Sequence, residues 1–117
     1  MIVIAGHLEF ATKEGRDGAV AMGAPAQQAT RDDEPGCLAY IFSADPCIDR
    51  NIQVYELWED EATLAAHFVH PNYNGMREAL RTFERTGGDV KKFRCDLSEP
   101  VYDPEGIARA DFFTAAD

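Results

Sequence analysis

The sequence is poor in basic residues and in cysteine, and both shortages exclude classes of protein. It has 11 Lys and Arg against 21 Asp and Glu, a formal net charge of -10 at pH 7. It therefore lacks the clustered cations that bind nucleic acids and anionic membrane surfaces. Cys37, Cys47 and Cys95 are odd in number and widely spaced, which argues against a disulfide framework and a Cys-x-x-Cys metal site. Small molecules or a second copy of the chain are the expected partners.

Long hydrophobic runs are also missing. The first ten residues, MIVIAGHLEF, have a short apolar stretch and no basic segment, which argues against a signal peptide and a membrane span. We therefore predict a cytoplasmic protein. The length of 117 residues is that of one domain. The acidic run at 59–61 has no His or further acid at ligand spacing, so no metal site is predicted.

Four segments have the composition and alternation of β-strands. They are residues 2–10, 37–44, 52–59 and 90–98. In the last segment, alternation predicts that Phe93, Cys95 and Leu97 point inward and that Lys92 and Arg94 lie on the opposite face. The second and third segments are separated by a short polar loop, which predicts an antiparallel hairpin.

The first helix is predicted to begin after Thr12, a residue suited to cap a helix N-terminus, and to run to about Asp32. Glycines within it weaken the helical pattern. Because proline removes a backbone donor, Pro25 is expected to kink or split the helix near Gly23.

A second helical region follows the third strand. Asp60 is predicted to cap a short helix that Pro71 stops near His70, and another segment starts at Asn72 or Asn74. The apolar stripe of that segment consists of Tyr73, Met76, Leu80 and Phe83, and Gly87 with Gly88 are predicted to cap its C-terminus.

The order strand, helix, strand, strand, helix, strand predicts an α+β fold of the ferredoxin-like type. In this split βαβ pattern (β-α-β-β-α-β), an antiparallel sheet carries its helices on one face. Residues 1–98 form the predicted domain, and residues 99–117 form a C-terminal tail. The tail contains several apolar residues, Val101, Tyr102, Ile107, Phe112 and Phe113. Since they are too many to leave in solvent, we predict a homodimer in which sheets face each other and the tail packs on the partner subunit.

Two stretches, EPGCLAYIFSADP at 34–46 and YELWEDEATLAAHFVHPNY at 55–73, resemble the antibiotic biosynthesis monooxygenase family of dimeric α+β barrels. The positions that carry the resemblance are Glu34, Pro35, Gly36, Tyr40, Asp45, Pro46, Tyr55, Glu56, Trp58, His67 and Pro71. The resemblance implies a homodimer with a pocket in each subunit between sheet and helices. It also implies a monooxygenase that oxidises an aromatic polyketide, phenol or quinol with O₂ and needs no metal, flavin or haem, so no cofactor is expected.

Oxygenation without a cofactor needs an apolar pocket, a base near neutral pH and donors for negative charge on oxygen. His67 is the predicted base, since imidazole titrates near neutral pH. The indole of Trp58 could donate to oxygen, and Tyr73 is placed for substrate contact, so these three are the predicted catalytic residues. The other predicted pocket residues are His7, Tyr40, Glu56, Phe68 and Met76.

Structural roles compete with each of these assignments. His67 could serve only to hydrogen-bond a neighbouring group, and Trp58 could be a core residue. Glu56, flanked by apolar neighbours, would need a partner if buried, with Lys92, Arg94 or a backbone donor as candidates. His7 could instead lie on the dimer face and pair with Glu9.

Other functions stay open at this point. A non-catalytic dimer that binds a metabolite would need the same fold motifs. An isomerase of a small phosphorylated sugar would need cations near the phosphate, and only Arg77 and Arg81 lie close by in the sequence. Haem degradation, by the family resemblance, calls for Asn, Trp and His where this chain has His7, His67 and Arg77, which argues against it.

Overall fold

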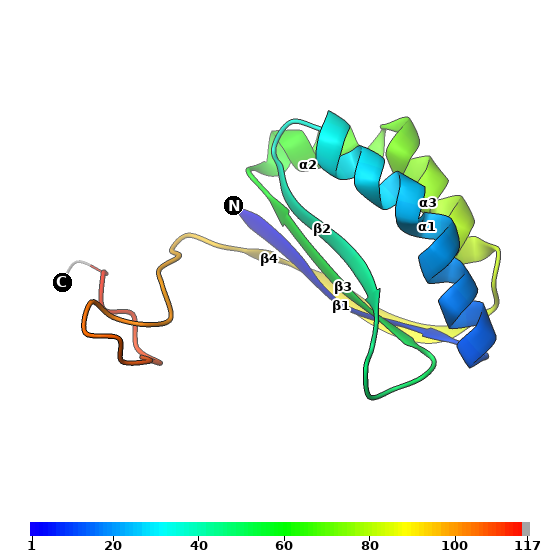
Figure 1. Cartoon of the computed structure of the whole chain (residues 1–117). Coiled ribbons are helices and arrows are strands. Elements are labelled where there is room, and N and C mark those ends of the chain that lie inside the picture. The colour runs from blue at the N-terminus through cyan, green and yellow to red at the C-terminus, as the bar shows by residue number, and fades with distance from the viewer. Residues whose placement is uncertain (116–117) are drawn as a thin grey trace.

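Seven elements follow one another in the predicted order, and the second helical region consists of a short helix and a further helix that begins at Pro71, in agreement with the two segments predicted there. The computed structural model describes residues 1–115, and the elements are β1 (Ile2–Phe10), α1 (Lys13–Asp33), β2 (Cys37–Ala44), β3 (Asn51–Trp58), α2 (Glu61–Phe68), α3 (Pro71–Arg81) and β4 (Arg85–Arg94). The strands form one antiparallel sheet in the order β2-β3-β1-β4. All three helices lie on one face of this sheet, as the ferredoxin-like prediction requires (Figure 1).

The core lies between the sheet and the helices. Alternation along β1 and β3 puts Ile2, Ile4, Leu8, Val54 and Trp58 on this face, and all of them are buried. The sheet's other face carries no helix (Figure 1). On it lie Ile41 and Tyr55, which are partly exposed, and Phe93, which is half exposed. The fold therefore has one packed face and one face without a cover in the single chain, on which these apolar side chains are exposed to solvent.

Helix α1 is continuous from Lys13 to Asp33, so of the predicted kink or split near Gly23 the split is wrong. Thr12 caps its N-terminus as predicted, accepting a hydrogen bond from the Gly15 N–H at 2.9 Å. Gly23 has a packing role instead of a helix-breaking one, because a Cβ at this buried position would lie 2.9 Å from Sδ of Met76. The glycine thus lets α1 and α3 approach each other closely.

The short helices begin at strong local signals. Asp60 accepts a hydrogen bond from the Thr63 N–H, and the Thr63 hydroxyl in turn reaches the Asp60 backbone, a complete capping box. Helix α3 begins at Pro71, one residue before the predicted start, with His70 as its N-cap. The ring nitrogen Nδ1 of His70 accepts from the Asn72 N–H at 3.0 Å. These caps fix the short connection between α2 and α3.

Strand β4 begins at Arg85, five residues before the predicted start, and ends at Arg94. The prediction of Gly87 and Gly88 as a helix cap is therefore wrong. The two glycines pair with Glu9 and Leu8 of β1, and a Cβ on Gly88 would lie 2.9 Å from the His7 carbonyl oxygen.

The side-chain facing predicted for β4 is also reversed. Phe93 pairs with Val3 on the open face of the sheet, while Lys92 pairs with Ile4 and Arg94 with Ile2 on the helix face. Cys95 and Leu97 follow the end of the strand. The β1 register, which single-strand alternation does not reveal, decides this facing.

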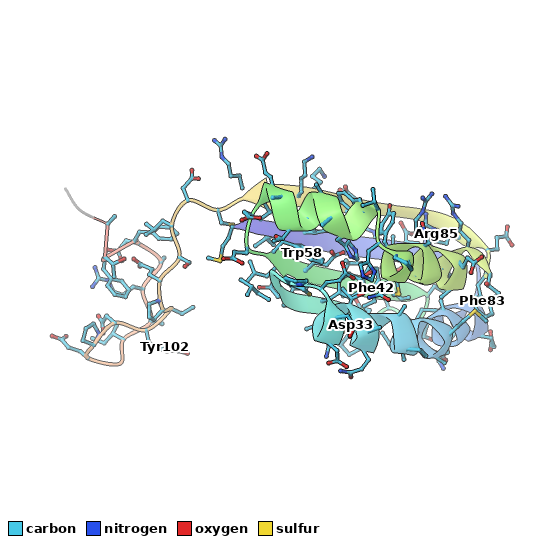
Figure 2. All side chains as sticks on the ribbon, turned by 90° about the horizontal axis from the view of Figure 1, so that it is seen from above. Asp33, Phe42, Trp58, Phe83, Arg85 and Tyr102 are labelled. Carbon is cyan, nitrogen blue, oxygen red and sulfur yellow. The ribbon has the colours of Figure 1, made fainter. Side chains whose placement is uncertain are left out.

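The chain after β4 runs away from the sheet and folds into a loop of its own (Figure 1). Within it, Tyr102 and Ala108 form a β-bridge, and Glu99 accepts hydrogen bonds from the Phe113 and Thr114 N–H groups. Tyr102 lies far from the sheet and is 62% exposed (Figure 2). The last two residues of the predicted tail, 116 and 117, lie outside the described residues. None of the helices in residues 1–115 is both long and apolar enough to cross a membrane.

Candidate functional site

The Glu-Pro-Gly turn between α1 and β2 brings Glu34 to the start of the site. The Cys37 N–H donates to the Glu34 carbonyl oxygen at 3.3 Å, and Gly36 has a φ of 84°, which side-chain-bearing residues rarely adopt. A Cβ on Gly36 would lie 2.4 Å from the side chain of Thr63 in α2. The turn therefore packs against α2, and the buried Glu34 side chain faces that helix.

His67 of α2 is held by Glu34. Its ring nitrogen Nδ1 lies 2.8 Å from Oε1 of Glu34, and the histidine side chain is 1% exposed. The other carboxylate oxygen accepts from the Asn72 side-chain amide at 3.2 Å. Because a carboxylate can only accept, Nδ1 must carry the shared hydrogen, which leaves Nε2 with its lone pair. A carboxylate thus fixes both the tautomer and the orientation of the imidazole.

The free nitrogen of His67 is suited to accept a proton. Within residues 1–115 its Nε2 has no hydrogen-bond partner, and no fully buried side-chain nitrogen or oxygen lacks one. Nε2 therefore borders space that water or a small molecule can reach. Burial lowers the pKa of His67 below its ordinary value, although the hydrogen bond and charge of Glu34 act in the opposite direction. The imidazole is consequently neutral, and a base, at neutral pH.

Aromatic rings surround this imidazole on several sides. The centroid of its ring lies 4.6 Å from that of Trp58, 5.3 Å from those of Tyr40 and Tyr73, and 5.9 Å from that of Phe68. Burial and the nearby carboxylates raise the pKa of the Tyr40 phenol, which therefore stays protonated. The structure thus places four of the predicted site residues around the predicted base.

Glu56 is a second buried carboxyl group, and its partner is Trp58. The indole N–H of Trp58 donates to Oε1 of Glu56 at 2.9 Å, so it is not free for a ligand while this bond holds. Within the described chain Glu56 forms no ion pair, and the predicted pairing with Lys92 or Arg94 is wrong. Ile4 separates Glu56 from Lys92 in the sheet register. Burial raises the pKa of Glu56 to about 7.

Two open pockets lie along the helix face of the sheet, one beside α2 and one beside α3. The α2 pocket has a volume of about 410 Å³ and is lined by Ile2, Glu61, Leu64, Ala65, Phe68, Lys92 and Arg94. The α3 pocket has a volume of about 310 Å³ and is lined by Leu8, Phe42, Val54, Glu56, Tyr73, Arg77, Leu80, Arg81, Arg85 and Val90. The rings of Phe68 and Tyr73, one from each pocket, meet edge to face at 5.2 Å. The His67 ring lies behind these two rings, at centroid distances of 5.9 and 5.3 Å, and is not itself among the residues that line either pocket.

Two predicted pocket residues lie elsewhere. Met76 is 2% exposed and packs between α3 and α1, so it belongs to the core. His7 lies on the open face of the sheet, where its Nε2 is 3.3 Å from Oε2 of Glu9. The alternative pairing of His7 with Glu9 is therefore confirmed.

Sequence reasoning missed the residues that hold or surround the site from a distance. The sequence identifies Glu34 only as one of the positions that carry the family resemblance, although it orients His67, and Asn72 only as a helix start. Three further cations, Arg85, Lys92 and Arg94, line the pockets together with Arg77 and Arg81. The spacing of Glu34 and His67 gives no periodic signal. Only the reversed facing of β4 brings Lys92 and Arg94 to the pocket side.

The residues of these pockets offer no evident metal site. Within residues 1–115 no three His, Cys, Asp or Glu side chains gather so that they could hold a metal ion. What the arrangement supplies is a neutral imidazole, a buried carboxyl group that titrates near neutral pH, and aromatic walls. Such a site can move a proton to or from a small aromatic molecule.

The chain is similar in sequence and in fold to other known proteins. An uncharacterized protein of Synechocystis sp. is 29% identical over 93 residues, which cover 80% of this chain. The chain spans 62% of that relative's length. Solved structures that share the fold include a protein of Deinococcus radiodurans, provisionally assigned as an antibiotic biosynthesis monooxygenase. The superposition has a TM-score of 0.74 at 21% sequence identity, and it covers 88% of this chain and 100% of the Deinococcus radiodurans chain.

A second solved structure, with the same provisional assignment, comes from Caulobacter crescentus. Its TM-score is 0.72 at 16% identity, over 84% of this chain and 90% of its own. At these identities the likeness concerns the fold alone. The sequence pattern of the family described as antibiotic biosynthesis monooxygenase matches residues 1–79, which run from β1 into α3 and include every residue named above around His67. The chain therefore belongs to the antibiotic biosynthesis monooxygenase family.

Proposed function

We propose that this protein is a cofactor-independent monooxygenase that oxidises a small phenol or quinol with O₂. The observation that carries the proposal is the imidazole of His67, fixed by Glu34 through Nδ1 and free at Nε2. Deprotonation of a phenolic hydroxyl or an anthrone-type carbon by Nε2 would produce an electron-rich anion. Such an anion can reduce O₂ directly, and the aromatic walls around His67 keep the reacting atoms away from bulk water.

The electron balance of this reaction needs no other reductant. For an anthrone, the carbanion and O₂ form a hydroperoxide at the ring carbon. Loss of water from the hydroperoxide leaves a carbonyl group, so one oxygen atom enters the quinone and the other enters water. The substrate supplies both electron pairs. His67 takes the first proton of the ring carbon and returns it to the peroxide oxygen, then takes the second proton of that carbon and passes it to the leaving hydroxide, which becomes water.

Oxygen consumption tests the proposal directly. Purified, metal-free protein is incubated with a panel of anthrones and quinols, and O₂ uptake is followed with an electrode after subtraction of the rate without protein. We expect at least one compound to be oxidised with one O₂ consumed per quinone formed. No uptake above the background across the panel would remove the monooxygenase proposal and leave a binding protein or an isomerase.

We also propose that the protein acts as a homodimer in which the open faces of two sheets meet. Support comes from Ile41, Tyr55 and Phe93, which leave this face apolar and uncovered. The tail exposes further apolar residues, among them Val101 at 63% and Phe112 at 60%. Apolar groups in this number are expected to be covered by a partner.

Removal of the tail is expected to weaken the dimer. A chain that ends at Ser98 should dissociate at a protein concentration at least about tenfold higher than the full chain, measured by sedimentation equilibrium. The double substitution Tyr102→Ser and Phe112→Ser should reproduce most of this loss at full length, because both side chains are more than half exposed in the single chain. An unchanged dissociation constant in both variants would exclude a role of the tail in the dimer.

A further inference from the structure

Basic residues gather around the two pockets in a protein of strongly negative charge. Arg77, Arg81 and Arg85 line the α3 pocket, and Lys92 and Arg94 line the α2 pocket. These five are nearly half of the 11 Lys and Arg in the sequence, whose net charge is -10. They come from α3 and β4, and Arg85 lies where the chain enters β4 beside the end of α3 (Figure 2). The fold thus collects cations that are dispersed along the chain.

Most of these cations lack an acidic partner. In the described part of the chain, Arg81, Arg85 and Lys92 form no ion pair and donate no side-chain hydrogen bond, and Arg77 only lies over the Tyr73 ring at 5.4 Å. Elsewhere, Lys13 and Arg16 pair with Asp17, Lys91 with Asp89 and Arg109 with Asp111, while Arg31 and Arg50 form no ion pair in residues 1–115. Arg94 lies 3.7 Å from Asp96, so four of the six cations without an ion pair in the described chain line the pockets.

Protection of an edge strand explains only part of this pattern. Lys92 and Arg94 lie on β4, at the edge of the sheet, where charged residues discourage pairing with other chains. Arg77 and Arg81 lie on α3, four residues apart. Like charges at this spacing repel each other and slightly destabilise a helix. A helix that keeps such a pair beside a pocket is suited to bind an anion there.

We propose that the α3 pocket binds an aromatic acid, with the carboxylate against Arg77, Arg81 and Arg85 and the ring against Tyr73. Guanidinium groups bind carboxylates through paired, charge-assisted hydrogen bonds. The only carboxyl group that lines this pocket is Glu56, which is buried deeper in the sheet. The ring hydroxyl of a ligand held at its acid end by the arginines would face Glu56 and the side of Tyr73 that contacts the His67 ring. The volume of about 310 Å³ fits a small ligand.

The aromatic acid would be the substrate of the proposed monooxygenase, and this part of the inference rests on the proposed function. Binding of the acid does not, because binding can be measured without turnover. The matched probes are 2,5-dihydroxybenzoate, a quinol with a carboxylate, and its neutral methyl ester. Calorimetric titration under argon excludes oxidation. We expect the acid to bind at least about tenfold more tightly than the ester at low salt, and 0.5 M NaCl to reduce that ratio by screening the charges.

Substitution locates the anion site. The double variant Arg77→Gln and Arg81→Gln should bind the acid about as weakly as the ester, while its affinity for the ester stays within about twofold of the parent protein. Lys91→Gln is the matched control, because it removes a cation from β4 on the open face, where Lys91 pairs with Asp89. This control should keep the tenfold preference. The salt dependence of the unmodified protein tests the same point without any variant.

Three results would overturn the inference. Equal affinity for acid and ester, a preference that survives the double substitution, or tighter binding of inorganic phosphate than of the acid would each exclude a carboxylate site at these arginines. The last result would instead favour a phosphorylated ligand. Tight binding of the acid without O₂ uptake would leave the anion site intact and remove the proposed oxygenation, so the two proposals can fail separately.

Discussion

Replacement of His67 by glutamine is expected to lower kcat for oxygen consumption about a hundredfold or more, because it removes the base that starts the reaction. Glutamine is the informative replacement. Its amide N–H can still donate to Glu34, whose side chain is 5% exposed, whereas alanine would leave Oε1 of that carboxylate buried without a donor and Asn72 as the remaining partner. Initial rates with the best substrate of the panel, at saturating concentration, measure the loss. Circular dichroism checks that the variant folds.

A nearby control separates loss of the base from disturbance of α2. Val69→Ala changes a side chain that is 82% exposed, two residues after His67, and should leave kcat within about twofold of the parent. If His67→Gln retained most of the activity, His67 would be a structural residue, and Glu56 would become the candidate base.

The role of Glu34 shows in the pH profile of the same reaction. Glu34 raises the pKa of His67, opposing the larger effect of burial. The acid limb of the rate profile reflects protonation of His67, so Glu34→Gln should move that limb to lower pH as well as reduce kcat. A Glu34 that served only the turn would change stability and leave the limb where it is.

Local signals were sufficient to predict most of the fold from the sequence. The alternation in residues 2–10 and the caps at Thr12 and Asp60 depend on neighbours within a few positions, and the structure confirms them. Gly23 and Gly88 were misinterpreted because their reasons lie in distant parts of the chain. Gly23 is fixed by contact with Met76 and Gly88 by the β1 backbone. In the sequence, a glycine that ends a helix cannot be distinguished from a glycine that allows another segment to pack closely against the backbone.

The site was predictable where its residues are close in sequence. His67, Trp58 and Tyr73 lie on consecutive elements, and the structure brings their rings together. Glu34 contributes from 33 residues away, and its chemical role depends on how the turn packs against α2. The cations of β4 depend on the strand register, and a shift by one residue exchanges the two faces of a strand. Contacts of this kind have no spacing rule that a single sequence reveals.

Glu56 is a buried carboxyl group without a cationic partner, and burial of such a group in its ionised form lowers the stability of the folded protein. Glu56 is 6% exposed, and the donor that supports it is the neutral indole of Trp58. Glu34 nearby adds a repulsive charge, and burial is the larger cause of the raised pKa of Glu56, about 7 against an ordinary value of 4.5. The folded protein therefore binds this proton more tightly than the unfolded chain, so ionisation of Glu56 opposes folding.

Substitution of Glu56 by glutamine is therefore expected to stabilise the protein at high pH and to have little effect at low pH. In the parent protein, the stability that the protonated carboxyl group contributes is fully present below pH 4.5 and is lost as pH rises through about 7. At about 1.4 kcal/mol per pH unit, the loss approaches about 3 kcal/mol above pH 8. Glutamine keeps the shape and the acceptor for Trp58 but does not ionise.

Urea unfolding followed by the fluorescence of Trp58, the only tryptophan of the chain, measures this difference. The free energies of unfolding of parent and Glu56→Gln should agree within about 1 kcal/mol at pH 4.5 and diverge above pH 7, with the variant the more stable. Other groups titrate in both proteins and largely cancel in the difference. Curves that stay parallel from pH 4.5 to 8.5 would mean that Glu56 ionises as easily in the folded protein as in the unfolded chain. If they diverge, Glu56 lowers the stability of the protein at the pH where its carboxylate could accept a proton. Residues that serve a function often lower stability in this way.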